Sequence, residues 1–332
     1  MSNKHHSPLT LQGIKWKAMN TTWTIYAPWS STEIETGKPA WQDIIHHQVE
    51  RFEHSLSRFR STSEVSKMNE LQLGCQMVVS ELFHAILVDS LLMNQQTDGW
   101  FSPFLGKQIK RVGYTQSIEQ VKAADPATRA INRSFQMPTI SQSDSCSQEP
   151  LSFVSANPPK WQKNAEVDLD FGGIGKGWMA DRIAKQLRTV WNVPCGLVDA
   201  GGDLTVWGIS ESQPFIIDIQ DPWDEDKVIA DTTLVAGALA TSNRVYRKWQ
   251  NADGSWMHHL LDPHTGLPST SPTVQATVHA ECAMLADVWA KCLCMLPPED
   301  AFEWISKQKG AFAAWIVTED GNLQTWSTTK AR

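Results

Sequence analysis

The stretch VDLDFGGIGKGWMAD, residues 167–181, decides the fold of this chain. Apolar and polar residues alternate over 167–171, which predicts a short strand, and apolar residues from Trp178 to Leu187 recur at helical spacing. Four glycines lie between and at the edge of these segments: Gly172, Gly173, Gly175 and Gly177. We interpret the stretch as a strand, a glycine turn and a helix.

A glycine turn at the start of a helix suits a phosphate-bearing ligand. Without β-carbons the backbone can approach a ligand closely, and the first N–H groups of a helix favour anions. Lys176, inside the turn, adds a positive charge. The alternative is a plain tight turn between a strand and a helix, which recurs in many folds. The spacing matches neither G-x-G-x-x-G nor G-x-x-x-x-G-K-[ST], the two common nucleotide-binding motifs.

The composition is typical of a soluble globular protein. With 332 residues, 41% of them hydrophobic and 20% charged, the chain can bury a large core. A net charge of −7 argues against nucleic acid as a partner, because phosphate backbones are bound by basic surfaces. No secretory signal, lipid-attachment cysteine or membrane-spanning apolar stretch is found, so we expect a cytoplasmic protein. Its six scattered cysteines are expected to be reduced thiols.

Hydrophobic periodicity predicts regular elements along most of the chain. We expect a disordered tail over 1–13 and one domain over 14–332, with an exposed Ser- and Pro-rich loop at 139–159. Helices are predicted at 41–59, 78–96, 283–296 and 301–308, with a short helix capped by Ser63. Strands are predicted at 16–27, 196–198, 204–207, 215–219, 235–240, 257–261, 273–279, 311–317 and 323–328, with the turn Asp199–Asp203 between the second and third.

Two further segments carry residues suited to catalysis or metal binding. Residues 258–266 read HHLLDPHTG, and a histidine beside such a turn acts either as a general base near pH 7 or as a hydrogen-bonded structural residue. Asp287 lies in an otherwise apolar helix, where a carboxylate needs a partner. It either forms a salt bridge with Lys291, one turn later, or helps to hold a hard divalent cation.

Eight short motifs, in order from Met19 to Trp326, carry a family resemblance. With the family pattern that each resembles in parentheses, they are Met19-Asn20-Thr21 (M-G-T), Leu56–Ser66 (L-S-x-[FY]-x-x-x-S-x-[LV]-[SM]), Thr97–Phe101 (T-D-G-A-F-D), Asp170–Gly177 with the glycine turn (D-L-G-G-I-[AG]-K-G), Asp199–Asp203 (N-A-G-G-D), Ala240-Thr241-Ser242 (A-T-S-G), His259–Pro263 (H-I-I-D-P) and Met284–Asp287 (A-M-x-A-D). Each motif alone is weak, but together they resemble the FAD:protein FMN transferases, the ApbE family.

The resemblance implies both a fold and an activity. The fold would be mixed α/β (α+β), ApbE-like or T-fold-like, with an antiparallel sheet and packed helices in two intimately packed subdomains. Family members bind FAD and, with Mg²⁺, cleave its pyrophosphate. They pass the FMN half to a Thr or Ser of an acceptor flavoprotein that carries a D-G-x-[ST]-G-A-[ST] target, and AMP leaves.

The family's functional residues carry over onto matching positions of this chain. The implied FAD-binding residues are Met19, Phe59, Trp100, Phe101, Ser102, Gly172, Gly175, Trp178 and Pro263. The Gly175 carbonyl and the Asp287 carboxylate would bind Mg²⁺, and Lys176 would lie near the phosphates. His259 would be the base that takes the proton of the acceptor hydroxyl.

Several positions depart from the family pattern. Lys291 stands where the family has Thr or Ser, and Cys282 stands where many members have Asp, so two hard oxygen ligands are replaced. Lys291 could supply part of the metal's charge or take the metal's place. Asn20, Ser102 and Asn243 also differ from the family residues. The alternatives to transfer are therefore an FAD-binding carrier or assembly protein with weakened or lost catalysis, and an FAD pyrophosphatase.

Overall fold

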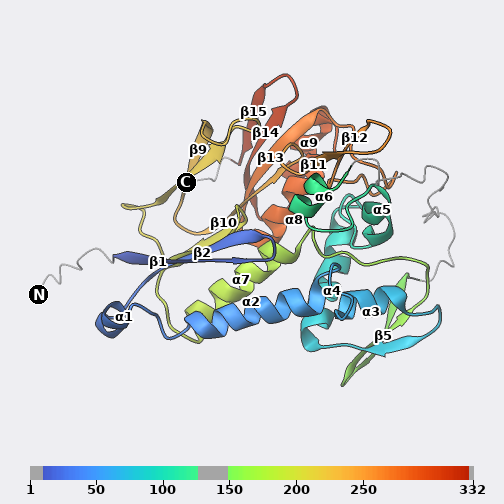
Figure 1. The fold of residues 1–332 in the computed structure, drawn as a ribbon. Helices are drawn as coiled ribbons and strands as arrows, with labels where there is room; N and C mark the ends of the chain where they lie inside the picture. The colour runs from blue at the N-terminus through green and yellow to red at the C-terminus, as the bar shows by residue number, and fades with distance from the viewer. Residues whose placement is uncertain (1–9, 126–148, 329–332) are drawn as a thin grey trace, which may run out of the picture.

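The structure is a computed structural model, and it describes residues 10–125 and 149–328 (Figure 1). Its centre is an eight-stranded sheet with the spatial order β1-β2-β6-β7-β10-β13-β14-β15, in which every neighbouring pair is antiparallel. The strands are β1 (Leu11–Ala18), β2 (Thr21–Pro28), β6 (Gly196–Ala200), β7 (Leu204–Trp207), β10 (Gly237–Asn243), β13 (Thr273–Ala280), β14 (Ala311–Thr318) and β15 (Leu323–Ser327).

Three small antiparallel sheets surround the main one. One has the order β3-β5-β4, and the other two are the pairs β8-β9 and β11-β12. Their strands are β3 (Gln76–Val78), β4 (Leu151–Ala156), β5 (Pro159–Lys163), β8 (Phe215–Gln220), β9 (Val228–Leu234), β11 (Lys248–Gln250) and β12 (Trp256–His258).

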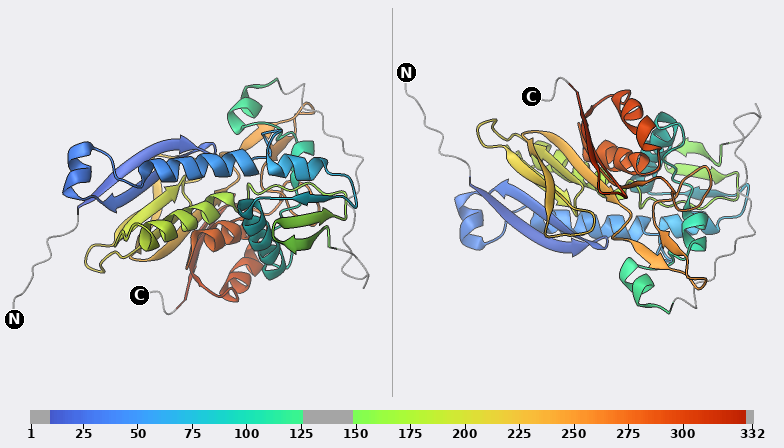
Figure 2. Two further views of the ribbon diagram at one scale, coloured as in Figure 1. Left: turned by 90° about the horizontal axis from the view of Figure 1, so that it is seen from below. Right: turned by 90° about the horizontal axis from the view of Figure 1, so that it is seen from above.

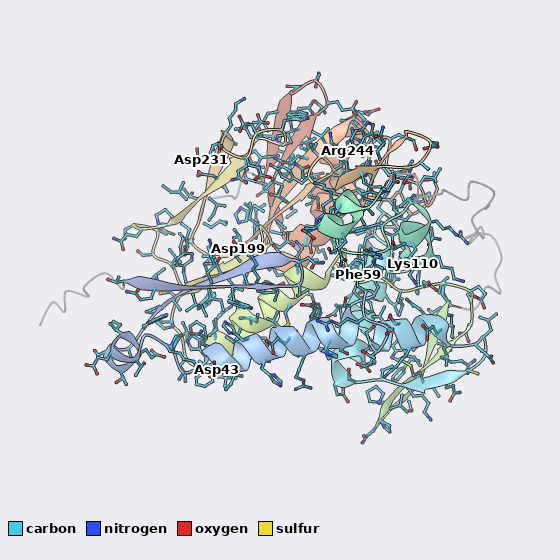
Figure 3. The ribbon with its side chains drawn as sticks, in the orientation of Figure 1. Asp43, Phe59, Lys110, Asp199, Asp231 and Arg244 are labelled. Atoms are coloured by element: carbon cyan, nitrogen blue, oxygen red, sulfur yellow. The ribbon has the colours of Figure 1, made fainter. Side chains whose placement is uncertain are left out.

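Helices cover one face of the main sheet. The helices are α1 (Ser31–Thr36), α2 (Gln42–Leu56), α3 (Glu64–Glu70), α4 (Glu81–Gln96), α5 (Gly106–Arg111), α6 (Ile118–Ala123), α7 (Gly175–Thr189), α8 (Ala283–Leu293) and α9 (Pro298–Ser306). Seen from below, α2, α7 and α8 lie next to one another (Figure 2). Helix α2 begins near Asp43 and runs toward the middle of the molecule, where Phe59 follows three residues after the end of the helix (Figure 3).

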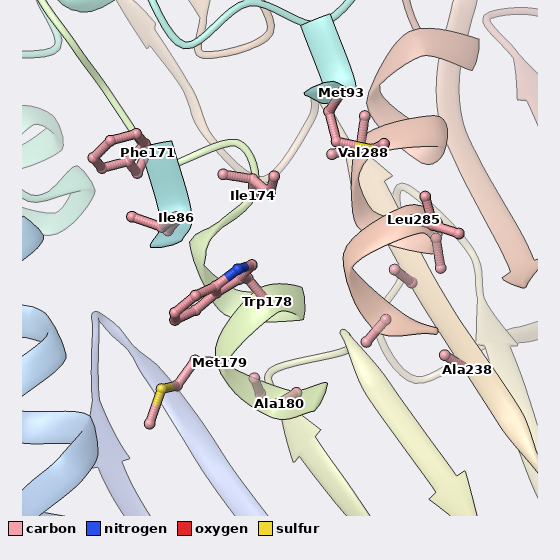
Figure 4. Close-up of a cluster of buried hydrophobic side chains, with 14 of the residues drawn as sticks. Ile86, Met93, Phe171, Ile174, Trp178, Met179, Ala180, Ala238, Leu285 and Val288 are labelled. Carbon is pink, nitrogen blue, oxygen red and sulfur yellow. The ribbon is translucent and has the colours of Figure 1, made fainter. Parts of the chain in front are cut away.

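The core lies between these helices and the sheet. Trp178, Met179 and Ala180 of α7 are buried beside Leu285 and Val288 of α8 (Figure 4). Burying large apolar side chains of this kind contributes roughly 1.5–3 kcal/mol each relative to leaving them exposed. The two helices that carry the predicted phosphate-binding turn and Asp287 are therefore fixed relative to each other by apolar packing.

Near the N-terminus, the predicted single strand over 16–27 is wrong. The chain forms the hairpin β1-β2, in which Met19 and Asn20 make the turn with positive φ values of 51° and 57°. Asparagine tolerates this left-handed region better than most residues do, and the hairpin turn needs it. Strand β1 already begins at Leu11, so residues 11–13 are not a disordered tail; residues 1–9 lie outside the described part.

Two other predicted segments also differ. Of the predicted loop at 139–159, residues up to 148 lie outside the described part, but β4 and the start of β5 form a hairpin within the remainder. The predicted strand at 167–171 does not form a ladder. Its backbone N–H groups at Leu169 and Asp170 donate instead to Asn69 Oδ1 (2.7 Å) and the Pro103 carbonyl (2.8 Å). These partners lie outside any sheet, so the segment is an extended loop.

The other predicted helices and strands are present, with ends that shift by a few residues. The predicted strand at 257–261 is reduced to the three residues of β12. Ser63 caps α3 as predicted, since its side chain accepts a hydrogen bond from Ser66 N. Within residues 10–125 and 149–328, no helix has the length and apolar character required to cross a lipid bilayer.

Candidate functional site

A cavity of about 640 Å³ opens between the end of α2, the glycine turn, the start of α5, the loop after β12, and α8. It brings together segments that are far apart in the sequence. The predicted site residues that line it are Met19, Phe59, Trp100, Phe101, Ser102, Gly172, Gly175, Lys176, His259 and Pro263. A cavity of this size suits a small-molecule ligand.

The glycine turn forms one wall of the cavity. Gly175 N donates to the Phe171 carbonyl (2.8 Å), which closes the turn, and α7 begins at Gly175. Gly172 N donates to Asp170 Oδ1 (2.8 Å). Asp170 is held in turn by Arg58 Nε at 3.1 Å, in an ion pair whose Arg58 side chain is buried. The turn is therefore fixed at both ends before any ligand binds.

Aromatic side chains form the outer wall. Phe59 packs edge-on against Tyr114, with ring centroids 5.9 Å apart, and the Arg58 guanidinium lies over both rings. On the other side, the Trp100 ring contacts His264 at a centroid distance of 4.6 Å. Phe59 is 40% exposed, an unusual value for a phenylalanine, and it borders the cavity. Such rings offer flat apolar surface to a planar ligand.

Two lysine–aspartate pairs lie at the base of the cavity. Lys176 donates to Asp203 Oδ2, and Lys291 donates to Asp287 Oδ1. Both lysines line the cavity, whereas neither aspartate does, and each aspartate side chain is only 1% exposed. The four groups are formally neutral together.

The charges of this cluster act on one another. Burial and the nearby Asp287 carboxylate raise the pKa of Asp203 to about 6, although Lys176 opposes this shift. Burial alone would lower the pKa of Lys176, but the carboxylates of Asp203 and Asp287 raise it above its ordinary value. Lys176 is therefore held in its charged form, which is the form that binds phosphate.

His259 lies in the cavity wall just after β12. Burial and then the positive charge of Arg247 lower its pKa well below the ordinary value of 6.5. Its Nδ1 atom is buried and has no hydrogen-bond partner in the part of the chain that the structure describes. The imidazole is therefore neutral near pH 7, with a ring nitrogen free to accept a proton.

The turn that follows His259 is held by Asp262, whose carboxylate accepts hydrogen bonds from His264 N (2.8 Å) and Thr265 Oγ1 (3.2 Å).

Comparison with known proteins places the chain in a family. The model of the ApbE family matches residues 19–316. The chain belongs to the ApbE family. The FAD:protein FMN transferase of Escherichia coli K12 is 25% identical over 313 residues, covering 93% of this chain and 85% of that protein. The FAD:protein FMN transferase of Treponema pallidum is 25% identical over 284 residues, covering 82% of this chain and 75% of that protein.

Solved ApbE structures share the fold. The ApbE protein of Thermotoga maritima superposes with a TM-score of 0.75 at 24% identity, covering 95% of this chain and 96% of that one. The apo form of the Pseudomonas stutzeri flavinyl transferase ApbE gives a TM-score of 0.70 at 22% identity, covering 96% and 95%. The predicted family and the predicted mixed α/β fold with antiparallel sheet and packed helices are both confirmed.

Two of the residues implied by the ApbE resemblance do not line the cavity. Trp178 is buried beneath it, where its ring packs against Phe52 at a centroid distance of 5.7 Å and its Nε1 donates to Asp89 Oδ2 (2.6 Å). Asp287 does not line the cavity either; its carboxylate is paired with Lys291, which does. Helical spacing predicts that Trp178 lies on α7, but it cannot show which face of α7 meets the cavity.

Two residues of this ApbE site were missed from the sequence. Asp203 stands in the quoted motif Asp199–Asp203, so a signal was present, but its pairing with Lys176 depends on the hairpin β6-β7. Arg247 lines the cavity and forms no ion pair with another described residue. An arginine beside a strand is usually a surface residue, and no sequence pattern marked this one.

The Mg²⁺ site expected from the ApbE resemblance does not fit the residues present. Asp287 Oδ1 accepts from Lys291, and Oδ2 lies 3.4 Å from Gly177 N, so both carboxylate oxygens already have donors. Among the described residues, no group of three or more His, Cys, Asp or Glu side chains is arranged to hold a metal ion. A divalent ion added at Asp287 would also lie next to the Lys291 ammonium, which repels it.

Proposed function

We propose that this protein transfers the FMN half of FAD to a hydroxyl group of an acceptor flavoprotein and releases AMP. The observation that carries the proposal is one cavity lined by the glycine turn with its Lys176, by Lys291 and by His259, whose buried Nδ1 has no hydrogen-bond partner among the described residues. In this arrangement the two lysines would bind the pyrophosphate, and His259 beside them would act as the base. The relatives named FAD:protein FMN transferase support the same reaction.

In this proposal the cavity walls hold the two ends of FAD. The aromatic wall formed by Phe59 and Trp100 and the segment Phe101–Ser102 would bind the planar rings, with Met19 and Pro263 at the border. The backbone at Gly172 and Gly175 would let the pyrophosphate approach closely. Lys176 and Lys291 would neutralise its charge, because ammonium groups form charge-assisted hydrogen bonds with phosphate oxygens. Trp178 would support the turn from below rather than contact FAD.

The proposed reaction is a displacement at the phosphorus of the FMN half. The hydroxyl oxygen of an acceptor Thr or Ser forms the new P–O bond, and the bond from that phosphorus to the bridging oxygen breaks. AMP leaves with the bridging oxygen and its electron pair. His259 accepts the hydroxyl proton on its free nitrogen, which makes the weak nucleophile more reactive. The role of the two lysines is to stabilise negative charge on the phosphates as the leaving group departs.

The resemblance also implies Mg²⁺ held by Asp287 and the Gly175 carbonyl, supplying a Lewis acid to the phosphates. Since these residues do not fit the ion, no step of the proposed reaction uses it. The proposed acceptor carries the D-G-x-[ST]-G-A-[ST] target of the family resemblance. A cytoplasmic location stays a prediction from the sequence.

The test is to incubate the protein with FAD and an acceptor domain that carries this target, with and without Mg²⁺, and to look for flavin fluorescence in a denaturing gel. A fluorescent acceptor band together with stoichiometric AMP is expected. Release of FMN and AMP without a labelled acceptor would identify an FAD pyrophosphatase instead. Tight FAD binding with neither product would identify a carrier, and in both cases the transferase proposal fails.

A further inference from the structure

The Lys291 ammonium contacts Asp287, one of the two residues that the family resemblance assigns to a metal ion. Its Nζ contacts Asp287 Oδ1 and also lies 3.3 Å from the Asp287 carbonyl oxygen, one helical turn earlier. The side chain is only 14% exposed, and its exposed part faces the cavity. The position of the ammonium is therefore set by α8 itself and does not depend on a ligand.

The Lys291 side chain packs against the glycine turn. A β-carbon on Gly173 would lie 3.6 Å from Lys291 Cδ and 3.7 Å from Cε, which is van der Waals contact. The aliphatic part of Lys291 thus runs along the backbone of the turn, while its ammonium contacts Asp287. Lysine can bury its methylene groups in this way while its charged end stays near a polar surface.

Both carboxylate oxygens of Asp287 already face hydrogen-bond donors. Gly177 N approaches Asp287 Oδ2, and Lys291 Nζ contacts Asp287 Oδ1. The second lysine that lines the cavity, Lys176, is paired with a different carboxylate, that of Asp203. Each lysine that lines the cavity is therefore paired with one buried carboxylate, and Lys291 already occupies the position beside Asp287 that a cation would take.

We propose that the Lys291 ammonium replaces the divalent cation in this chain, so that it binds FAD without Mg²⁺. This inference rests on the proposed function, since it concerns the same substrate. Lys291 and Lys176 together bind the pyrophosphate, and Asp287 positions Lys291 rather than a metal.

The first test uses the unmodified protein. FAD is titrated while flavin fluorescence is followed, once in EDTA and once in millimolar MgCl₂. We expect dissociation constants that agree within about twofold, since the Asp287 carboxylate is already paired with Lys291. Binding of Mn²⁺, followed by electron paramagnetic resonance, should show no ordered site in the presence of FAD. Tightening of FAD binding by Mg²⁺ of tenfold or more, or one tightly bound Mn²⁺ per chain, would overturn the inference.

The second test changes the cation. Lys291→Thr frees Asp287 and adds a hydroxyl oxygen, so FAD binding should weaken about 10- to 100-fold in EDTA, as expected for loss of a charge-assisted hydrogen bond. MgCl₂ should restore much of that loss in the variant. Lys291→Met, which has no oxygen ligand, should show the same weakening with less restoration. If Lys291→Thr binds FAD in EDTA as tightly as the unmodified protein does, Lys291 does not supply the charge and the inference fails.

Lys307→Thr is the matched control. Lys307 also pairs with an acid one helical turn earlier, Glu303 (2.7 Å), but both side chains are exposed on α9 and lie outside the cavity. This variant should bind FAD normally in either buffer.

The inference and the proposed function would be contradicted by different results. FAD binding that occurs only with Mg²⁺ overturns the inference alone, whereas a protein that binds no FAD in any buffer overturns the proposed function.

Discussion

Lys176 in the glycine turn donates a hydrogen bond to Asp203 in the turn between β6 and β7, 27 residues further along the chain. The contact joins the start of α7 to the main sheet at the base of the cavity. Asp203 Oδ1 is buried without a hydrogen-bond partner among the described residues, so Lys176 is the group that compensates this carboxylate.

We predict that Lys176→Met destabilises the protein strongly. Removal of one partner leaves the Asp203 carboxylate buried without a counter-charge, and such changes cost about 3–5 kcal/mol. Urea denaturation at pH 7 measures the loss. Lys176→Met combined with Asp203→Asn should recover part of it, since no buried charge then remains. For comparison, Lys307→Met removes an exposed ion pair and should cost less than about 1 kcal/mol. Equal stability of Lys176→Met and the unmodified protein would refute the prediction.

We predict that His259→Ala lowers the transfer rate about 100- to 10,000-fold, the usual contribution of a general base. FAD binding should stay within a few fold, because the imidazole is assigned to the acceptor proton rather than to the flavin. Single-turnover labelling and FAD titration measure the two effects separately. His258→Ala is the control, since its Nε2 contacts the Ser269 carbonyl (3.1 Å) and it does not line the cavity. Loss of FAD binding in His259→Ala would identify His259 as a structural residue.

The lowered pKa of His259 has a consequence for pH dependence. Because the imidazole is neutral well below its ordinary pKa of 6.5, its protonation should not reduce the transfer rate between pH 8 and pH 6. A pH–rate profile of the unmodified protein, corrected for stability, measures this. A fall in rate with a midpoint near 6.5 would contradict the burial-induced shift.

We predict that Gly177→Ala is strongly destabilising. A β-carbon there would lie 2.4 Å from the Ala283 carbonyl oxygen, a backbone atom that moves only if α7 and α8 separate. Overpacking of this kind typically costs about 1–3 kcal/mol and occasionally more. Thermal denaturation checks it. Gly172→Ala should cost less, since the nearest atom would be Asp170 Oδ1 at 3.0 Å, which belongs to a side chain. The opposite order of the two variants would contradict the close packing of α7 on α8.

We predict that Asp181 makes the protein less stable as the pH rises from 4 to 7. Burial raises its pKa from 3.8 to about 6, although hydrogen bonds from Met284 N and Ala283 N oppose the shift. The folded protein therefore holds this proton more tightly than the unfolded chain does. The stabilisation is present below about pH 4 and is lost as the pH passes 6, to the extent of about 3 kcal/mol at 1.36 kcal/mol per pKa unit.

Asp181→Asn tests this prediction, because an amide resembles the protonated carboxyl group. Its free energy of unfolding should match that of the unmodified protein near pH 4 and exceed it at pH 7. Urea denaturation at several pH values gives both curves. Parallel curves for the two proteins would show that Asp181 is ionised throughout and would refute the prediction.

The sequence by itself determined the family, most helices and strands, and ten of the residues that line the cavity. It did so because apolar periodicity reports local structure and because the motifs at Phe59, Trp100, the glycine turn and His259 lie in segments whose turns are fixed by nearby residues. It also predicted that Lys291 could reach Asp287, since residues four apart on a helix are neighbours. The strand at 167–171 was wrong because alternation reports which side chains are buried, not what the backbone bonds to.

Only the tertiary structure decided which of these residues meet. Asp203 reaches Lys176 through the register of β6 and β7, and Gly177 N reaches Asp287, 110 residues away, through the packing of α7 on α8. The same packing turned Trp178 away from the cavity and directed Lys291 toward it. Such contacts depend on how whole elements are arranged in space, and spacing along a single segment carries no information about that arrangement.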